Sequence, residues 1–201
     1  MFDTPLLLAK NEGLTFDQRL AKRVLDLVVS IIALVITSPV MLVIAIAIKA
    51  YDGGPVFFVQ DRCTINGKVF KIHKFRSMIE NAEKDGEVIP ATDDDARITP
   101  VGKIIRKTRL DELPQFFDIL IGNMSVVGPR PERVEHVEKY VEEVPEFTYR
   151  MKVKGGLTGY AQIYGKYNTS AYDKLKLDLM YIQNYSILLD LRLILMTVCL
   201  L

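Results

Sequence analysis

The chain has 201 residues, with 26 lysines and arginines against 25 aspartates and glutamates, and its formal net charge is +1. A hydrophobic fraction of 49% excludes a disordered chain, which would combine low hydropathy with high net charge. The balanced charge argues against a dedicated nucleic-acid-binding protein, because no basic excess is present to neutralise a phosphate backbone. With two cysteines and two histidines, the chain provides neither a disulfide framework nor a zinc cluster, and a reducing compartment is expected.

The first long element predicted is a membrane helix. Residues 27–48 contain no charged side chain, and a straight helix of that length would measure ~33 Å, near the hydrocarbon thickness of a bilayer. Ser38-Pro39 lies in the middle of this run, where proline removes an N–H and clashes with the preceding turn. Lysines and arginines flank both ends, which favours a chain that enters the membrane and returns on the same side. These features leave a re-entrant hairpin and a kinked span equally open, and the Ser38 hydroxyl is expected to satisfy one carbonyl freed by the break.

The segments after this helix predict a mainly helical α+β chain. Two short strands, residues 56–60 and 69–73, flank the turn Asn66-Gly67 and are expected to pair as a hairpin. Further helices are expected over residues 104–120, with an interruption at Pro114, over 134–144 and over 171–185.

Two other segments each allow two environments. Residues 80–95 are acidic without apolar periodicity, which is typical of a surface loop or a lid. Residues 187–201 are apolar but too short to span a bilayer, so they are expected to lie along the membrane interface or to form an ordinary core helix.

Two adjacent carboxylates, Asp111 and Glu112, follow closely on Arg106, Lys107 and Arg109. Neighbouring helical residues point about 100° apart, so the two acids cannot perform one function together. They can serve different tasks, in which one attacks or holds a metal and the other takes a proton. By spacing alone, a solvated and salt-bridged helix face is the favoured interpretation.

Three more segments offer groups for binding anions or metals. Arg130 is fixed between two prolines, which suits either an oxyanion-binding arginine or a rigid turn with an exposed arginine. The glycine-rich residues 155–162 allow close backbone approach and offer donors for a phosphate or a base, which is weak evidence alone. The three aspartates at residues 93–95 match either a divalent cation site, as in metal-dependent glycosyltransferases, or a solvated loop.

Taken together, these segments resemble the bacterial sugar transferase family, the small monotopic phosphoglycosyl transferases. The motifs occur in order through nearly the whole chain: KRVLD, Ser38-Pro39, FKIHKFRSM, DARITPVGKIIRKTRLDELPQ, MSVVGPRPE and GLTGYAQIYGK. The resemblance implies a re-entrant membrane helix hairpin broken at Ser38-Pro39, a cytoplasmic catalytic domain and interfacial amphipathic helices. It divides the chain into a polar lead-in over residues 1–23, the re-entrant helix over 24–49 and the catalytic domain over 50–201.

The resemblance also implies a reaction. A sugar-1-phosphate would move from a UDP-sugar to polyprenyl (undecaprenyl) phosphate with release of UMP, and the product would begin an exopolysaccharide or another surface glycan. Mg²⁺ is the implied cofactor. The implied location is the cytoplasmic face of the bacterial inner membrane, in contact with lipid, and a homodimer is compatible with the sequence.

By the same resemblance, Asp111 is the nucleophile that forms a covalent phosphosugar intermediate, and it also contributes to the Mg²⁺ site. Glu112 is its partner, which deprotonates the acceptor phosphate or helps to hold the metal. The phosphate and substrate contacts implied by matching motifs are Arg106, Arg130, Lys74, Arg76, Lys154, Thr158 and Gln162. This chain departs from the family at Lys154-Gly155-Gly156, where arginine-proline-glycine is common, so charge is kept but bidentate geometry is not.

Two alternatives of other classes stay open. A metal-dependent glycosyltransferase that uses residues 93–95 would release UDP instead of UMP. A non-enzymatic membrane-anchored module would show no turnover with UDP-sugars, and Asp111→Asn would have no effect on such a reaction.

Overall fold

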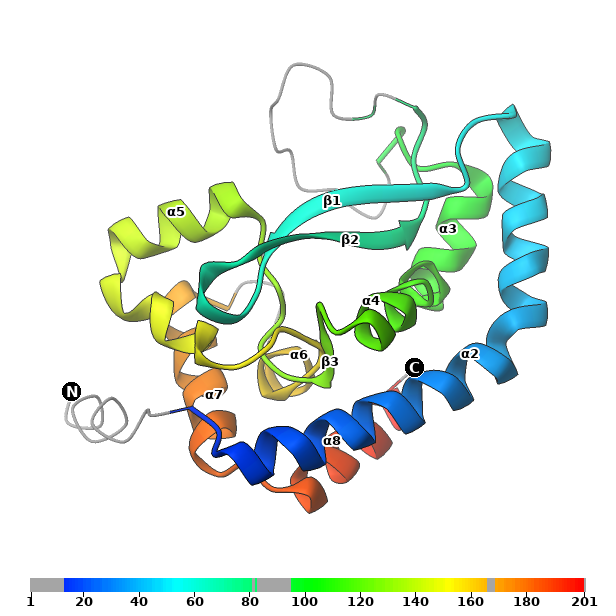
Figure 1. Cartoon of the computed structure of the whole chain (residues 1–201). Helices are drawn as coiled ribbons and strands as arrows, with labels where there is room; N and C mark the ends of the chain where they lie inside the picture. Colours follow the sequence, from blue (N-terminus) through cyan, green and yellow to red (C-terminus); the bar gives the residue numbers. More distant parts are fainter. Residues whose placement is uncertain (1–12, 81, 83–94, 166–168, 201) are drawn as a thin grey trace.

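One long helix frames the molecule in the computed structural model, which describes residues 13–80, 82, 95–165 and 169–200 (Figure 1). This helix, α2 (Phe16–Asp52), begins in a capping box, in which Thr15 and Gln18 each accept a hydrogen bond from the other's backbone N–H. The helix therefore starts earlier than residue 24, where the membrane segment was expected to begin. It ends at Gly53, whose left-handed backbone (φ 70°) suits glycine.

Helix α2 is bent in its middle into two arms (Figure 1). Pro39 lies inside the helix and has no N–H to offer the carbonyl of Val35. The hydroxyl of Ser38 donates to that carbonyl at 2.9 Å. The prediction that Ser38 satisfies a carbonyl freed by the proline is confirmed. The helix is long and apolar enough to cross a membrane, and only 17% of its most apolar stretch is buried, unlike the core helix of a soluble domain.

The predicted hairpin is confirmed. Strands β1 (Phe57–Cys63) and β2 (Val69–Phe75) pair antiparallel, from Phe57 opposite Phe75 to Cys63 opposite Val69. The connecting turn contains Asn66 and Gly67, both with positive φ (55° and 72°), as an Asn-Gly turn requires. The hairpin places Phe70 and Ile72 in the core.

Helices cover most of the remaining chain, and the predicted interruption before Pro114 is confirmed. The described elements are α3 (Pro100–Lys107), a 3₁₀ turn (Leu110–Glu112), α4 (Gln115–Ile121), α5 (Val134–Glu143), a 3₁₀ segment (Pro145–Lys152), α6 (Tyr160–Tyr164), α7 (Ala171–Gln183) and α8 (Ile187–Leu200). Most of the expected loop over residues 80–95 lies outside the described residues, as does the lead-in before Gly13.

Two short parallel strands were not predicted. β3 (Ser125–Val127) pairs with β4 (Gly156–Thr158), and three residues are too few to show a strand period in the sequence. The pairing depends on glycine, because a Cβ on Gly156 would meet the backbone nitrogen of Gly128 at 2.1 Å. This close approach fixes the two loops that follow β3 and precede β4.

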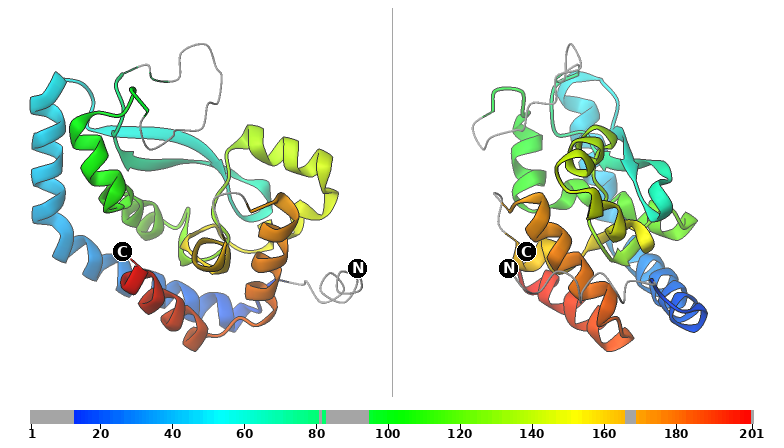
Figure 2. Two further views of the ribbon diagram at one scale, coloured as in Figure 1. Left: turned by 180° about the vertical axis from the view of Figure 1, so that it is seen from behind. Right: turned by 90° about the vertical axis from the view of Figure 1, so that its left-hand side faces the viewer.

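A buried charged cluster fastens the first arm of α2 to α8. The ammonium of Lys22 lies 2.7 Å from a carboxylate oxygen of Asp190, and the hydroxyl of Tyr181 bonds to both groups. All three side chains are buried. Because isolated buried charges are costly, this cluster specifies how the two apolar helices sit together. Figure 2 shows them running side by side along one edge of the molecule.

Large apolar side chains remain exposed along both helices. On α2 they are Phe16, Leu20, Val24, Val28, Ile31, Ile32, Val35, Ile36, Val40, Leu42, Val43 and Ile46, and on α8 they include Leu188, Leu191, Leu195, Val198 and Leu200. An exposed apolar surface of this extent marks an interaction with lipid or protein. The structure is thus a mainly helical α+β fold with a long apolar helix compatible with a membrane anchor.

Candidate active site

The two adjacent carboxylates lie on the short 3₁₀ turn between α3 and α4. Leu110 and Leu113 on either side of them pack against the small core formed by Ile44, Ile48, Phe75 and Ile105. Anchoring these flanking leucines leaves Asp111 and Glu112 pointing away from that core. The second arm of α2 contributes Ile44 and Ile48, so the long helix directly supports the turn.

Glu112 is held between two cations. Its Oε1 lies 2.8 Å from the Lys74 ammonium and 2.6 Å from the Arg130 guanidinium. Burial would raise the pKa of Glu112, but Arg130 and Lys74 outweigh burial and hold that pKa well below its usual range. Glu112 is therefore ionised near neutral pH, and its charge positions one cation from β2 and one from the loop after β3.

Asp111 has a different environment. It is buried, and burial raises the pKa of its carboxyl group, with Lys74 opposing the rise and Glu112 adding to it. A raised pKa makes the carboxylate more basic, and the nearby ammonium favours its ionised form. Asp111 thus has the character of a nucleophile, whereas Glu112 has the character of a fixed counter-ion.

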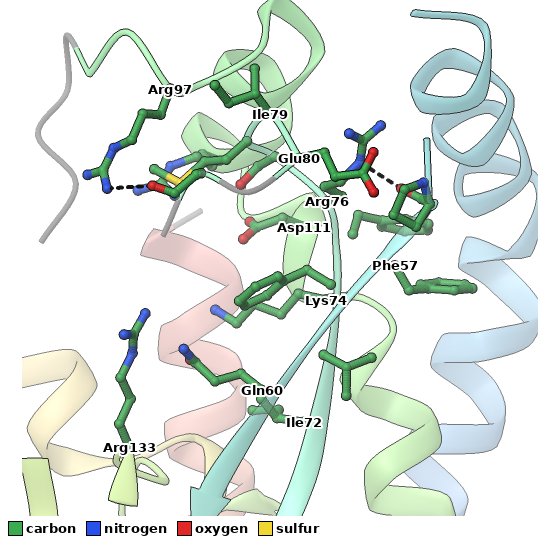
Figure 3. Close-up of a pocket in the computed structure, with 18 of the residues that line it drawn as sticks. Phe57, Gln60, Ile72, Lys74, Arg76, Ile79, Glu80, Arg97, Asp111 and Arg133 are labelled. Atoms are coloured by element: carbon green, nitrogen blue, oxygen red, sulfur yellow. Dashed lines mark hydrogen bonds between the residues drawn. The ribbon is translucent and has the colours of Figure 1, made fainter. Parts of the chain in front are cut away.

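Asp111 faces a cavity of about 610 Å³, which we call the cationic pocket. Its charged and polar lining includes Arg62, Lys74, Arg76, Arg97, Arg106, Arg133 and His136, while its apolar lining includes Phe57, Phe58 and Phe75. In Figure 3 the ends of Asp111 and Lys74 point toward the same space, which Arg97 and Arg133 face from other elements. This excess of cations suits a ligand with several negative charges, and the aromatic rings suit a flat apolar group.

Glu112 lines a second cavity of about 420 Å³, which we call the apolar pocket. Its lining comes from α2, α4, α6, α8, the two short strands and the 3₁₀ turn: Val29, Arg109, Glu112, Leu113, Phe116, Val126, Leu157, Thr158, Gln162, Ile163, Ile194, Thr197, Val198 and Leu200. The two carboxylates therefore stand on either side of one turn, each at a different pocket.

A network of buried ion pairs holds the backbone around Arg130. Arg150 donates to the carbonyl of Arg130 at 2.9 Å, and its guanidinium also pairs with Asp178 at 2.7 Å. Arg62 donates to the carbonyl of Pro131 at 3.2 Å. Arg130 is thus not an exposed arginine on a simple rigid turn, since its backbone and side chain are both anchored.

The structure gives the other expected contact residues different positions. Arg106 lines the cationic pocket, and Thr158 and Gln162 line the apolar pocket. Arg76 lines the cationic pocket, but its guanidinium pairs with Asp52 and donates to the carbonyl of Pro55. Arg76 therefore ties the end of α2 to β2.

Lys154 lines neither pocket. Its ammonium and the guanidinium of Arg23, on the first arm of α2, both lie next to Gly122. Burial lowers the pKa of this ammonium, and Arg23 adds to the shift. The structure does not bring Lys154 to the two carboxylates.

Sequence reasoning did not propose Arg62, Arg133 or His136 as binding residues, and it assigned His136 a packing or surface role. Arg62 follows the predicted end of the first strand, and its backbone forms a bridge with that of Arg133. Their nearness depends on the long-range pairing of β1 with the loop before α5. The one local signal is that Arg133 follows the MSVVGPRPE motif directly.

The described residues contain no group of three or more histidine, cysteine, aspartate or glutamate side chains placed to hold a metal. Asp95 is the described member of the aspartates at residues 93–95, and its carboxylate pairs with Arg97. Mg²⁺ commonly takes only one or two protein carboxylates and completes its shell with phosphate oxygens and water. Asp111 beside the cationic pocket is compatible with that kind of site.

Comparison with known proteins agrees with this architecture. The profile of the family described as bacterial sugar transferase matches residues 17–201. The UDP-glucose:undecaprenyl-phosphate glucose-1-phosphate transferase of Klebsiella pneumoniae is 46% identical, over 98% of this chain and 42% of the relative. The UDP-N-acetylgalactosamine-undecaprenyl-phosphate N-acetylgalactosaminephosphotransferase of Aeromonas hydrophila is 43% identical, over 88% of this chain and 42% of the relative.

The chain spans less than half the length of these two relatives. It also matches the uncharacterized sugar transferase EpsL of Bacillus subtilis, which is 39% identical over 88% of this chain and 85% of the relative. The chain belongs to the bacterial sugar transferase family.

Proposed function

We propose that the protein transfers a sugar-1-phosphate from a UDP-sugar to a polyprenyl phosphate at a membrane surface. The observation that carries the proposal is the position of Asp111 and Glu112 between a cationic pocket and an apolar pocket. A nucleotide sugar is soluble and highly charged, whereas a polyprenyl phosphate is a lipid with one charged end. The names of the relatives support the same pair of substrates.

The proposed chemistry has two steps. First, a carboxylate oxygen of Asp111 attacks the sugar-bearing phosphorus of the UDP-sugar, and the bond from that phosphorus to the bridging oxygen breaks, so UMP leaves with the bond's electron pair. An oxygen of the polyprenyl phosphate then attacks the same phosphorus, and the bond to Asp111 breaks. Lys74, Arg106 and Arg130 neutralise phosphate charge, which lets a carboxylate approach a diphosphate.

Mg²⁺ is part of this proposal. Asp111 would hold the ion together with diphosphate oxygens, and the bound ion would neutralise charge on the transferred phosphate. Glu112 already balances Lys74 and Arg130, so its contribution is to keep these two cations oriented toward the phosphate.

The reaction is tested by incubating the protein with UDP-sugars, polyprenyl phosphate and Mg²⁺ and identifying the nucleotide product. UMP supports the proposal, whereas UDP points to a metal-dependent glycosyltransferase and no nucleotide release points to a non-enzymatic module. Without acceptor, a labelled phosphosugar should remain on the protein and be lost in Asp111→Asn. The surface variant Asp61→Asn, which removes a carboxylate far more exposed than Asp111, should retain the label.

We also propose that α2 enters the membrane and returns on the same side, so that the catalytic domain stays on the cytoplasmic face. The bend and the Ser38 hydrogen bond support this, because they allow a change of direction without an unsatisfied carbonyl in lipid. Pro39→Ala should straighten the helix toward a span and lower turnover. Chemical labelling of residues at both ends of α2 in sealed vesicles would report sidedness, and unchanged sidedness together with unchanged turnover would contradict the proposal.

A further inference from the structure

The apolar pocket carries charge at only one end. Along its walls the hydroxyls of Thr158 and Thr197 lie 2.6 Å apart, Thr197 donates to the carbonyl of Leu193 at 2.8 Å, and the Gln162 amide nitrogen donates to the carbonyl of Gly128 at 3.3 Å. The buried Oε1 of Gln162 has no hydrogen-bond partner among the described residues. The rest of the wall is aliphatic or aromatic. The charged groups in its lining, Arg109 and Glu112, both lie on or beside the 3₁₀ turn.

Arg109 reaches this pocket through an unusual backbone conformation. Its φ is 53°, in the left-handed region, which costs energy for a side chain other than glycine. Residues three positions apart on one helix share a face, so a continued α3 would place Arg109 beside Arg106. The left-handed residue instead leaves Arg106 in the cationic pocket and brings Arg109 into the apolar pocket.

The guanidinium of Arg109 is available to bind an anion. In the described parts of the chain, no carboxylate forms an ion pair with it, since Glu112 pairs with Lys74 and Arg130 instead. The Arg109 side chain is exposed, so holding it in this position without a protein partner brings no stabilisation of its own. Its planar guanidinium fits a phosphate with two parallel hydrogen bonds.

The apolar pocket also borders a surface of exposed apolar side chains. Val198 and Leu200 line the pocket and are 66% and 68% exposed, on the same helix as the exposed Leu188 and Leu195. A chain that leaves the pocket there passes directly onto the apolar face that α8 shares with α2. The pocket is therefore charged toward the carboxylates and continuous with the surface proposed to contact lipid.

We propose that the apolar pocket is the acceptor site, in which Arg109 binds the phosphate of the polyprenyl phosphate and the walls take its first isoprenoid units. The assignment rests on the proposed function. A single anionic end on one apolar chain matches the distribution of charge in the pocket, whereas a phospholipid brings two acyl chains and a larger headgroup. The remaining isoprenoid units lie in the membrane along α8 and α2.

Photo-crosslinking tests the assignment without relying on turnover. The full chain in lipid nanodiscs is exposed to a polyprenyl phosphate with a diazirine near its phosphate, and labelled peptides are mapped by mass spectrometry. Labels are expected on residues that line the apolar pocket, on the 3₁₀ turn, α4, α6 and α8, and unlabelled polyprenyl phosphate should remove them while phospholipid should not. Labels confined to the cationic pocket, or equal competition by phospholipid, would overturn the assignment.

Kinetics provide a second test with matched variants. Arg109→Met is expected to raise the KM for polyprenyl phosphate by about tenfold, the loss of a charge-assisted hydrogen bond, without changing the burst of UMP seen before acceptor is added. Lys107→Met is the control, because Lys107 is an exposed neighbouring cation that lines neither pocket. Equal acceptor KM in the two variants would contradict a role for Arg109.

The apolar wall of the pocket is tested by substitutions on α8. Val198→Trp should fill the pocket and raise the acceptor KM by about tenfold. Leu195→Trp should not raise it, since Leu195 and Val198 are both 66% exposed but only Val198 lines the pocket.

The length of the acceptor provides a further test with the unaltered protein. The acceptor KM should fall as isoprenoid units are added and then level off once the pocket is filled. A constant KM along this series would count against the site. A missing UMP burst in the unaltered protein would instead refute the proposed reaction. The crosslinking result would then still show whether polyprenyl phosphate binds in the apolar pocket.

Discussion

The cationic pocket and the apolar pocket meet at Asp111 and Glu112, and their linings differ in kind. The first gathers arginines and lysine from β1, β2, α3 and the loop before α5, whereas the second is built from apolar residues of the two exposed helices and the short strands. The proposed substrates, a soluble nucleotide sugar and a membrane lipid, differ in the same way. Under the proposed function, one turn of chain would serve both substrates, with a separate pocket for each and a shared pair of carboxylates.

The largest expected effect comes from replacing Lys74, which pairs with Glu112 and lines the cationic pocket together with Asp111. Lys74→Met leaves Glu112 with one cation and removes the positive charge nearest Asp111, so the rate of UMP formation should fall ~10²–10³-fold. Asp111 must be ionised to attack, so its activity falls as pH drops through its pKa. Because Lys74 opposes the raised pKa of Asp111, the variant's acid limb should move to higher pH.

A pH profile of the burst rate measures this effect. Lys71→Met is the matched control, since Lys71 lies on the same strand, forms only an exposed ion pair with Asp61 and lines neither pocket. An unshifted acid limb in Lys74→Met would separate Lys74 from the ionisation of Asp111.

A smaller effect should distinguish the cationic pocket from the apolar pocket. Arg133→Met removes a cation from the cationic pocket only, so it should raise the KM for the UDP-sugar by about tenfold and leave the acceptor KM unchanged. Initial rates with each substrate varied in turn provide the measurement. Lys139→Met, on the exposed side of α5, is the control. A rise in the acceptor KM as large as that in the donor KM would contradict the binding of the two substrates in separate pockets.

The bent helix supports both pockets, and its bend can be weakened. Ser38→Ala leaves the Val35 carbonyl without a donor, which should lower the unfolding free energy by about 1–2 kcal/mol in lipid or detergent. Thr37→Val is the control. Thr37 also donates to a carbonyl, that of Ala33 at 2.7 Å, but in a continuous helix that carbonyl keeps its backbone bond. Denaturant unfolding in detergent micelles measures both variants, and equal losses would refute a special role for Ser38.

The smallest effect concerns the ion pair between Arg76 and Asp52, at the edge of the cationic pocket. The hydrogen bonds from Arg76 lower the pKa of Asp52 to about 2. A lowered folded-state pKa stabilises the protein above the unfolded value, near 3.8, and this contribution is lost as pH falls toward 2. Unfolding measured between these values should show a steeper acid loss in the unaltered protein than in Asp52→Asn. The control Asp61→Asn should keep the steeper loss.

Local sequence signals predicted the elements well. The Asn66-Gly67 turn predicted the hairpin, Pro114 marked the interruption before α4, and Ser38 was expected to replace the bond that Pro39 cannot make. Each of these depends on residues close in sequence. The bounds of the membrane segment within α2 stay a prediction, and local signals did not indicate that the fold buries Lys22 and Asp26 near the start of this helix.

The pockets could not be predicted in this way. Their linings join residues far apart in the chain, such as Val29 with Val198 in the apolar pocket and Arg62 with Arg133 in the cationic pocket. The sequence placed Arg106 and Arg109 in one basic run before the carboxylates, and no local pattern indicates that one left-handed residue sends them to different sides. The parallel pairing of β3 and β4 was likewise invisible, because it depends on a close approach of two distant glycines.

The ion pair between Lys22 and Asp190 joins positions separated by 168 residues. During translation, α2 leaves the ribosome long before its partner, and Lys22 cannot be buried at low cost until Asp190 arrives. Contacts of such long sequence separation form late, because a large loop must close first. The first arm of α2 should therefore stay loosely seated on a nascent chain, which gives the membrane time to capture it before α8 closes the fold.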